Sequence, residues 1–198
     1  NRTADFGVGA IDYELIDIPR SRFIGVAWSN IKTEQKGITS TITHAFNKNW
    51  EIKNVTSYQQ FNNDLFANVR PNSSSQFIKA DGKWIRGLQR TQIDEEYAIT
   101  QLDLTGKFNT GFVKHILLFG ADADQYYTTT YAFNGIAKYD SINVFDPSKY
   151  LPRNDIPNLT VRTETNVPIK RMGVYLQDLI ETTKYVKVLA GVRYSYLE

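Results

Sequence analysis

Residues 185–198, which read YVKVLAGVRYSYLE, decide the fold class because their side chains alternate in character. Apolar side chains occupy the even positions, namely Val186, Val188, Ala190, Val192, Tyr194 and Tyr196. The odd positions between them carry Lys187, Leu189, Gly191, Arg193 and Ser195. Successive side chains of a β-strand point to opposite faces, so a period of two is typical of a strand with one apolar face. The segment therefore predicts a strand rather than a helix.

Comparable runs flank three short polar turns, which lie at residues 47–49, 107–111 and 182–184. The runs on either side of these turns are, in chain order, residues 38–46 and 50–58, 98–108 and 112–131, and 173–181 and 185–196. The alternation is weakest in the first pair of runs, and Asp178 and Leu179 interrupt it before the last turn. We predict six antiparallel strands that are neighbours in chain order. They are joined as three hairpins with their tight turns at one end of the sheet.

Two long polar segments, residues 62–92 and 134–167, separate the hairpins and are rich in Asn, Ser, Gly and Pro. Loops of that length are rare in compact soluble domains. Short turns at one end and long loops at the other are typical of bacterial outer-membrane barrels, whose extracellular loops are the long ones. The apolar face from Val186 to Tyr196 would then contact lipid, with aromatic side chains at the membrane interface. The predicted fold class is all-β, an antiparallel transmembrane β-barrel segment.

Closure of the barrel bears on whether the chain is a whole domain. Six strands are fewer than the eight of the smallest common membrane barrels. Unpaired backbone groups at an open sheet edge cost several kcal/mol each in hydrocarbon, so an open edge is not tolerated there. The chain is therefore expected to be an interior portion of a larger barrel.

The composition favours a folded β protein and argues against several functional classes. The 12 Tyr and 11 Phe among 198 residues favour strands, because aromatic side chains fit a pleated, half-buried surface. A formal net charge of +2 gives no electrostatic case for binding nucleic acid. The absence of Cys excludes disulfides, thiolate metal sites and cysteine catalysis. No apolar run reaches the roughly 18 residues that a transmembrane helix requires.

Three passages carry a family resemblance. They are AFNKNWEI at residues 45–52, KFNTGFVKHILLFG at 107–120, and GVYLQD at 173–178 followed by GVRY at 191–194. Two shorter passages, IPRSRFIG at 18–25 and VFDP at 144–147, extend it over nearly all of residues 18–198. In this order and at this spacing, the passages resemble TonB-dependent siderophore receptors, the plugged 22-strand barrels of the bacterial outer membrane.

The resemblance implies a function for the receptor of which this chain is a part. Residues 1–198 would form a partial outer-membrane β-barrel domain, without the plug domain and the remaining strands. The complete receptor would bind a ferric siderophore at the cell surface and import it with energy delivered by TonB. Its expected partners are the ferric siderophore, the TonB complex through parts outside this sequence, and outer-membrane lipid. The chelator rather than the protein would hold the iron, and no catalysis is expected.

By the same resemblance, the chelate would bind among aromatic and Arg side chains contributed by loops and plug. Tyr126 is the first candidate, because it shares even parity with Asp122 and Asp124 and faces the lumen if they do. Tyr127 has the opposite parity and is expected to face lipid. The further ligand-binding candidates are Phe133, Trp84, Arg86 and Arg90, the arginines because they could attract an anionic chelate.

The histidines do not indicate a metal site. His44 and His115 lie near predicted turns, and neither belongs to a pattern with metal-ligand spacing. We interpret His115 as an interfacial residue bonded to backbone or to a lipid headgroup, and residues 94–96 as a solvated charged run. We predict no metal ion held directly by protein side chains and no resident cofactor.

Two other functional classes remain open at this point. An outer-membrane barrel enzyme, a protease or lipase, would gather Ser, His and a carboxylate at one barrel rim. Both histidines lie near the short turns and far from the long loops, which makes a surface-facing triad hard to build. A soluble β-sandwich binding module would instead pack the apolar face against a second sheet. A monodisperse monomer in buffer without detergent would exclude the membrane barrel.

Overall fold

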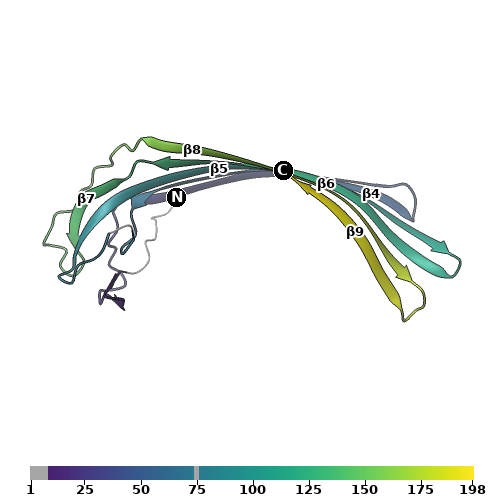
Figure 1. Ribbon diagram of the computed structural model, residues 1–198, viewed down its shortest axis with the longest axis horizontal. Coiled ribbons are helices and arrows are strands. Elements are labelled where there is room, and N and C mark those ends of the chain that lie inside the picture. Colours follow the sequence, from purple (N-terminus) through teal and green to yellow (C-terminus); the bar gives the residue numbers. More distant parts are fainter. Residues whose placement is uncertain (1–8, 74–75) are drawn as a thin grey trace. The chain divides into compact units, whose positions relative to one another are not determined.

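The computed structural model describes residues 9–73 and 76–198, in which all regular secondary structure is β (Figure 1). Its strands are β1 (Ala10–Ile11), β2 (Glu14–Leu15), β3 (Asn30–Ala45), β4 (Trp50–Asn68), β5 (Lys83–Thr110), β6 (Val113–Phe133), β7 (Ile136–Asn143), β8 (Val161–Glu181) and β9 (Lys187–Leu197). The part of the chain that the structure describes contains no helix long and apolar enough to cross a membrane.

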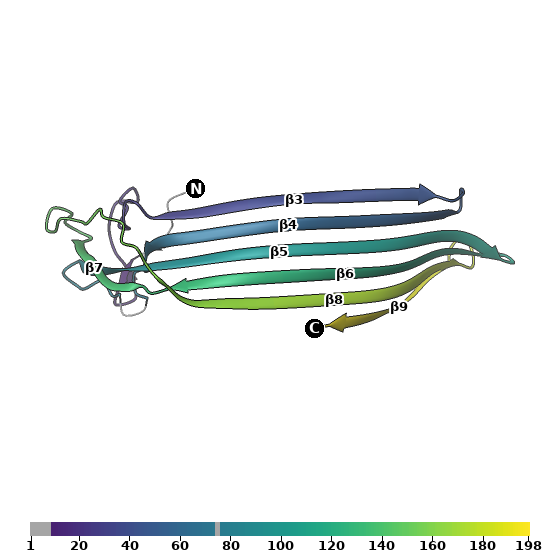
Figure 2. The same ribbon diagram turned by 90° about the horizontal axis from the view of Figure 1, so that it is seen from above.

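The long strands form one sheet in the order β3-β4-β5-β6-β8-β9, and their directions alternate along it (Figure 2). The predicted all-β sheet of antiparallel strands is thereby confirmed, and the six long strands follow one another across it in the order in which they occur in the chain. β7 was not predicted, and it pairs antiparallel with β5 outside this order. The short strands β1 and β2 pair only with each other among the described residues.

The strands are longer, and the loops shorter, than the sequence indicated. β4 continues to Asn68 and β5 begins at Lys83, so both strands enter the segment predicted as a loop at residues 62–92. β7 and the start of β8 likewise lie inside residues 134–167. Backbone hydrogen bonding does not depend on the polarity of the side chains, so a strand can continue where the apolar alternation has stopped.

The second turn is also tighter than predicted. β5 runs to Thr110 and β6 begins at Val113, so the turn consists of Gly111 and Phe112 instead of residues 107–111. Gly111 has a φ of +64°, a conformation that glycine adopts without steric cost. The other two turns lie where the sequence placed them, after β3 and after β8.

The chain divides into two compact units. Unit 1 comprises residues up to 34, 62–94 and 129–165, and unit 2 comprises residues 35–61, 95–128 and 166–198. The three tight turns belong to unit 2, whereas the connections between β4 and β5 and between β7 and β8 belong to unit 1. This division matches the predicted separation of short turns from long connections.

Unit 1 holds small apolar cores, which its connections help to build. Ile78, Trp84 and Val144 form one buried cluster, and Val26, Leu88 and Tyr139 form another. The register of β5 with β7 places Trp84 opposite Ile142 and Arg86 opposite Asp140. Residues of the connections and of β7 therefore bury parts of β5 that a bare strand would expose.

In unit 2, the register of β8 with β9 confirms which side chains share a face. Leu176 lies opposite Val192 and Ile180 opposite Val188, whereas Tyr175 lies opposite Arg193 and Glu181 opposite Lys187. Directly opposed residues of an antiparallel pair lie on the same face. One face is therefore mainly apolar and the other polar, as the alternation of residues 185–196 predicted.

Asp178 is the exception, because it lies opposite Ala190 on the apolar face. Its carboxylate Oδ2 is 2.6 Å from Nδ1 of His115 on β6, and Nε2 of His115 is 2.7 Å from the hydroxyl of Thr110. The His115 ring also stacks on Phe108 at a centroid distance of 4.8 Å. The expectation of a backbone or headgroup partner for His115 is thus wrong, because side chains of β5 and β8 satisfy both of its ring nitrogens.

Candidate ligand-binding site

Trp84, one of the predicted ligand-binding residues, is fully buried in unit 1. Its indole Nε1 donates a hydrogen bond of 3.0 Å to the carbonyl oxygen of Gln76. Ile78 and Val144 pack around the ring. Trp84 has no exposed surface with which to touch a ligand, and its place in this structure corrects the expectation of direct contact.

Arg86 is also buried, with 3% of its side chain exposed, and it pairs with Asp140, which is equally buried. Its Nε lies 2.7 Å from Oδ1 of Asp140, and one Nη donates to Oδ2 of the same carboxylate. The other Nη donates to the carbonyl oxygens of Ile24 and Gly25, at 3.1 and 2.6 Å. Steering of an anionic chelate by Arg86 is therefore not supported, because the carboxylate compensates its charge and protein covers it.

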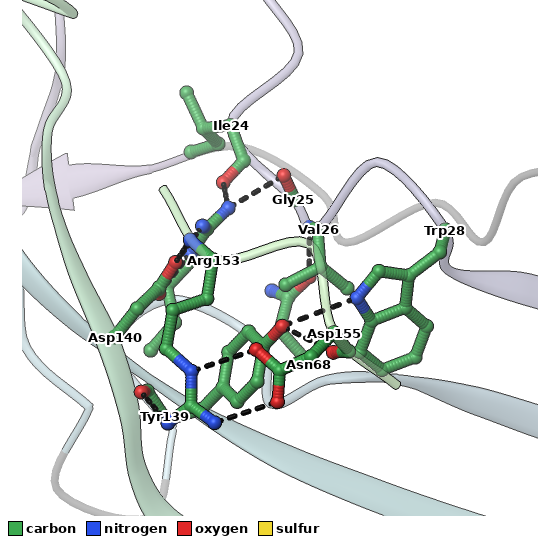
Figure 3. A network of polar contacts seen from close by, with 10 residues as sticks. Ile24, Gly25, Val26, Trp28, Asn68, Tyr139, Asp140, Arg153 and Asp155 are labelled. Atoms are coloured by element: carbon green, nitrogen blue, oxygen red, sulfur yellow. Dashed lines mark hydrogen bonds and ion pairs between the residues drawn. The ribbon is translucent and has the colours of Figure 1, made fainter. Parts of the chain in front are cut away.

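Figure 3 shows the polar contacts around Asp140, Arg153 and Asp155, the last two of which belong to the connection after β7. The backbone N–H of Arg153 donates to Oδ2 of Asp140 at 3.1 Å, and the guanidinium of Arg153 forms a bidentate pair with Asp155. The hydroxyl of Tyr139 donates to the carbonyl of Asp155 at 2.5 Å. The nearby Arg153 guanidinium lowers the pKa of the exposed Asp155 carboxyl. The network ties the connection to β7.

Arg90 and Phe133, two further predicted residues, lie together in unit 1. The Arg90 guanidinium is centred 4.7 Å from the Phe133 ring and 5.5 Å from the Phe66 ring. It also forms a bidentate pair with Asp64, with N–O distances of 3.0 and 2.8 Å. Arg90 retains 27% side-chain exposure, so it is the more accessible of the two predicted arginines.

Tyr126, the leading candidate, lies in unit 2 and lines a surface hollow of about 500 Å³. The other lining residues are Gln35, Gln59, Phe61, Glu95, Tyr97, Ile169 and Arg171. Tyr97 contacts Tyr126 edge to face, with ring centroids 6.4 Å apart. Arg171 pairs with Asp124 at 2.8 Å, so Tyr126 and Asp124 lie on the same face of β6, as their shared parity predicted.

Sequence reasoning missed most of the hollow around Tyr126. Glu95 belongs to residues 94–96, which the sequence predicts to be a solvated charged run, and Tyr97 and Arg171 are not among the predicted ligand-binding residues. The usable signal was parity, because Glu95 and Tyr97 share odd positions on β5 with Gln101 and Asp103. Which residues of β8 oppose those of β6 depends on register, and register is not visible in a single strand.

The family model for the beta-barrel of TonB dependent receptor-like proteins matches residues 1–198. The chain belongs to this family. TonB-dependent receptor barrels lie in the outer membrane of Gram-negative bacteria, so the long strands are membrane-spanning strands. This membership excludes the soluble β-sandwich, and it places the chain among receptors rather than among barrel enzymes.

Two curated relatives match nearly the whole chain. The metal-pseudopaline receptor CntO of Pseudomonas aeruginosa is 29% identical over 195 residues, which cover 96% of this chain and 26% of that relative. The probable TonB-dependent siderophore receptor PiuA of Acinetobacter baumannii is 24% identical over 210 residues, which cover 98% and 28%. The chain therefore spans about a quarter of the length of these relatives.

A solved receptor structure agrees with the fold. The ferric-catecholate import receptor Fiu of E. coli, in its closed form, matches with a TM-score of 0.73 and 20% sequence identity. The match covers 89% of this chain and 25% of the Fiu chain. At this identity the similarity establishes the arrangement of strands in a TonB-dependent receptor barrel and nothing about the ligand.

Proposed function

We propose that the chain is a wall and loop portion of an outer-membrane receptor that binds a ferric siderophore and imports it with energy delivered by TonB. The complete barrel would have 22 strands around a plug, which other parts of the receptor supply. The chelator holds the metal, and the protein contributes no resident cofactor and no catalysis. Family membership supports this proposal, as does the similarity to the metal-pseudopaline receptor CntO, the probable siderophore receptor PiuA and the ferric-catecholate import receptor Fiu.

The observation that carries the proposal is the hollow around Tyr126. It combines two tyrosine rings, two glutamine amides, a carboxylate and a guanidinium on the polar face of the sheet. Small-molecule sites combine apolar contact surface with a few placed polar groups, and this hollow offers both. Because polar faces of outer-membrane barrels line the lumen, these groups are placed where a polar chelate would pass.

Arg90 and Phe133 form a second candidate contact, in unit 1. The partly exposed guanidinium over the Phe133 ring could contact an anionic, aromatic chelate by charge and by stacking. Asp64 already neutralises part of that charge, so this contact ranks below Tyr126. Trp84 and Arg86 have a structural role, because their buried contacts stabilise the connections of unit 1.

Replacing Tyr126 with alanine in the complete receptor should weaken chelate binding by about 1–2 kcal/mol, the range of a useful but shared contact. That corresponds to roughly a 5- to 30-fold higher Kd. Tyr127→Ala should have less effect, because Tyr127 has the opposite parity and is exposed on the other face. Fluorescence titration of both purified variants with ferric catecholate and ferric pyoverdine measures this, with folding controls in the same detergent.

A larger loss at Tyr127 than at Tyr126 would show that the lumen-facing assignment of β6 is inverted. No loss at either position would move the site to Arg90 and Phe133 or to other parts of the receptor. TonB dependence is checked by uptake of radioactive iron into cells with and without TonB. Equal uptake in both would contradict the proposed transport mechanism.

A further inference from the structure

On the polar face of unit 2, one tyrosine reaches past its neighbouring strand. Tyr175 lies on β8, yet its hydroxyl donates to the Asp103 carboxylate and accepts a hydrogen bond of 3.1 Å from the Gln101 amide. Both of these partners lie on β5. β6 stands between β5 and β8 in the sheet order. The tyrosine side chain must therefore lie across β6.

Gly120 is the residue of β6 that permits this crossing. A Cβ at position 120 would lie 2.3–2.5 Å from three atoms of the Tyr175 ring and hydroxyl. Real Cβ atoms do not approach other atoms so closely, so the ring rests directly on the glycine backbone. Any other residue at position 120 would force the ring away from β6.

An arginine one strand further along uses the same arrangement. Arg193 of β9 crosses β8 and forms a bidentate pair with Asp122 of β6, at N–O distances of 2.7 and 2.9 Å. A Cβ at Gly173 of β8 would lie 2.2 Å from an Nη atom of Arg193. The Arg193 guanidinium is centred 5.4 Å from the Tyr175 ring, so the two flattened side chains adjoin.

Flattening changes how far the inner wall projects. Side chains of a strand normally stand roughly perpendicular to the sheet, and a Tyr or Arg standing so would extend its whole length into the lumen. A side chain that lies on a neighbouring strand projects only by its own thickness, about 3.5–4 Å. Two of the longest side chains on this face are therefore held against the wall at adjoining positions.

We propose that Gly120 and Gly173 are positioning residues for transport, which keep this tract of the inner wall flat so that a chelate can pass. The inference rests on the proposed function. It assigns these glycines no part in chelate affinity, because they lie outside the hollow that Tyr126 lines. Transport requires clearance, which here means free space in the lumen beside this tract of the wall, and it does not require the hydrogen bonds of Tyr175.

The test uses the complete receptor in cells and in purified form, with a ferric catecholate as the probe. Gly120→Ala should leave the Kd within about twofold of wild type but lower the uptake rate at saturating chelate by at least about fivefold. Gly106→Ala is the matched control, because a Cβ there would lie 2.4 Å from the Trp50 ring on the opposite, apolar face. It imposes a similar clash outside the lumen, and its uptake should match wild type.

Substitutions of Tyr175 separate clearance from a merely structural hydrogen bond. Tyr175→Phe keeps the flat ring but removes the bonds to Asp103 and Gln101, and it should import at the wild-type rate. Adding Tyr175→Ala to Gly120→Ala removes the displaced ring and should restore uptake. Wild-type uptake by Gly120→Ala, or an equally slow Tyr175→Phe, would overturn the inference.

A readout without chelate keeps this inference distinct from the proposed function. If the wild-type receptor binds no ferric chelate, the proposed function fails, but the position of the Tyr175 ring can still be determined. A structure of the Gly120→Ala receptor should show the ring lifted from β6 into the lumen. If the Tyr175 ring still lies across position 120 in that variant, Gly120 is not needed to keep the wall flat, and the inference is refuted whatever the receptor binds.

Discussion

Replacing Asp140 with alanine should lower the free energy of unfolding of the complete barrel by about 3–5 kcal/mol, the cost of breaking a buried ion pair from one side. The variant leaves the Arg86 guanidinium, which is 3% exposed, without its carboxylate partner. It also removes the acceptor for the backbone N–H of Arg153. Urea unfolding of the purified receptor in detergent measures the loss, and proteolysis within residues 144–160 should become faster.

Two further variants separate the buried charge from a general weakening of the connections. Arg153→Ala breaks a pair whose side chains are about half exposed, so it should change stability far less. The double substitution of Arg86 by Met and Asp140 by Leu removes both charges and should recover most of the loss, because no unpaired buried charge remains. A double variant as unstable as Asp140→Ala alone would show that the hydrogen bonds to Ile24 and Gly25 matter more than the ion pair.

Replacing Val192 with arginine should destabilise the complete barrel by roughly 2–4 kcal/mol if the residue lies near the bilayer midplane. Val192 lies opposite Leu176 on the apolar face of β8 and β9, the face that we expect to contact lipid. Ser195→Arg, on the polar face opposite Gly173, should cost less because we expect that face to line the lumen. Folding equilibria of both variants in lipid vesicles measure the difference, and equal costs would contradict the assignment of the two faces.

The strand pattern and its faces follow from local side-chain chemistry, which is why the sequence predicted them. The alternation around Val188 and Val192 reports burial on one face of a pleated strand. The turn after β5 is similarly local, because Gly111 supplies the positive φ that the turn requires. The family resemblance also depends on local sequence, because its motifs consist of turns and of adjacent residues that alternate in character.

The placement of the candidate ligand residues depends on partners that lie far away in the sequence. The sequence alone predicts that Arg86 is a solvated cation in a loop. In the structure, β7 brings Asp140, which lies 54 residues later in the chain, into contact with Arg86. The sequence alone predicts that Trp84 is an exposed aromatic side chain, whereas in the structure Ile78 and Val144 cover it. Asp178 breaks the alternation of its own strand because its partner, His115, lies 63 residues earlier on β6.

The sequence by itself determined the all-β class, the order of the hairpins, the apolar and polar faces of the strands, and the family. Each of these depends on a local feature, namely an alternation with a period of two, a turn or a short motif. Only the tertiary structure decided which cations are buried, which residues share the hollow of Tyr126, and that Tyr175 and Arg193 lie over Gly120 and Gly173. These features depend on inter-strand register and on burial. A shift of one residue would turn every side chain of a strand to the other face without altering its composition.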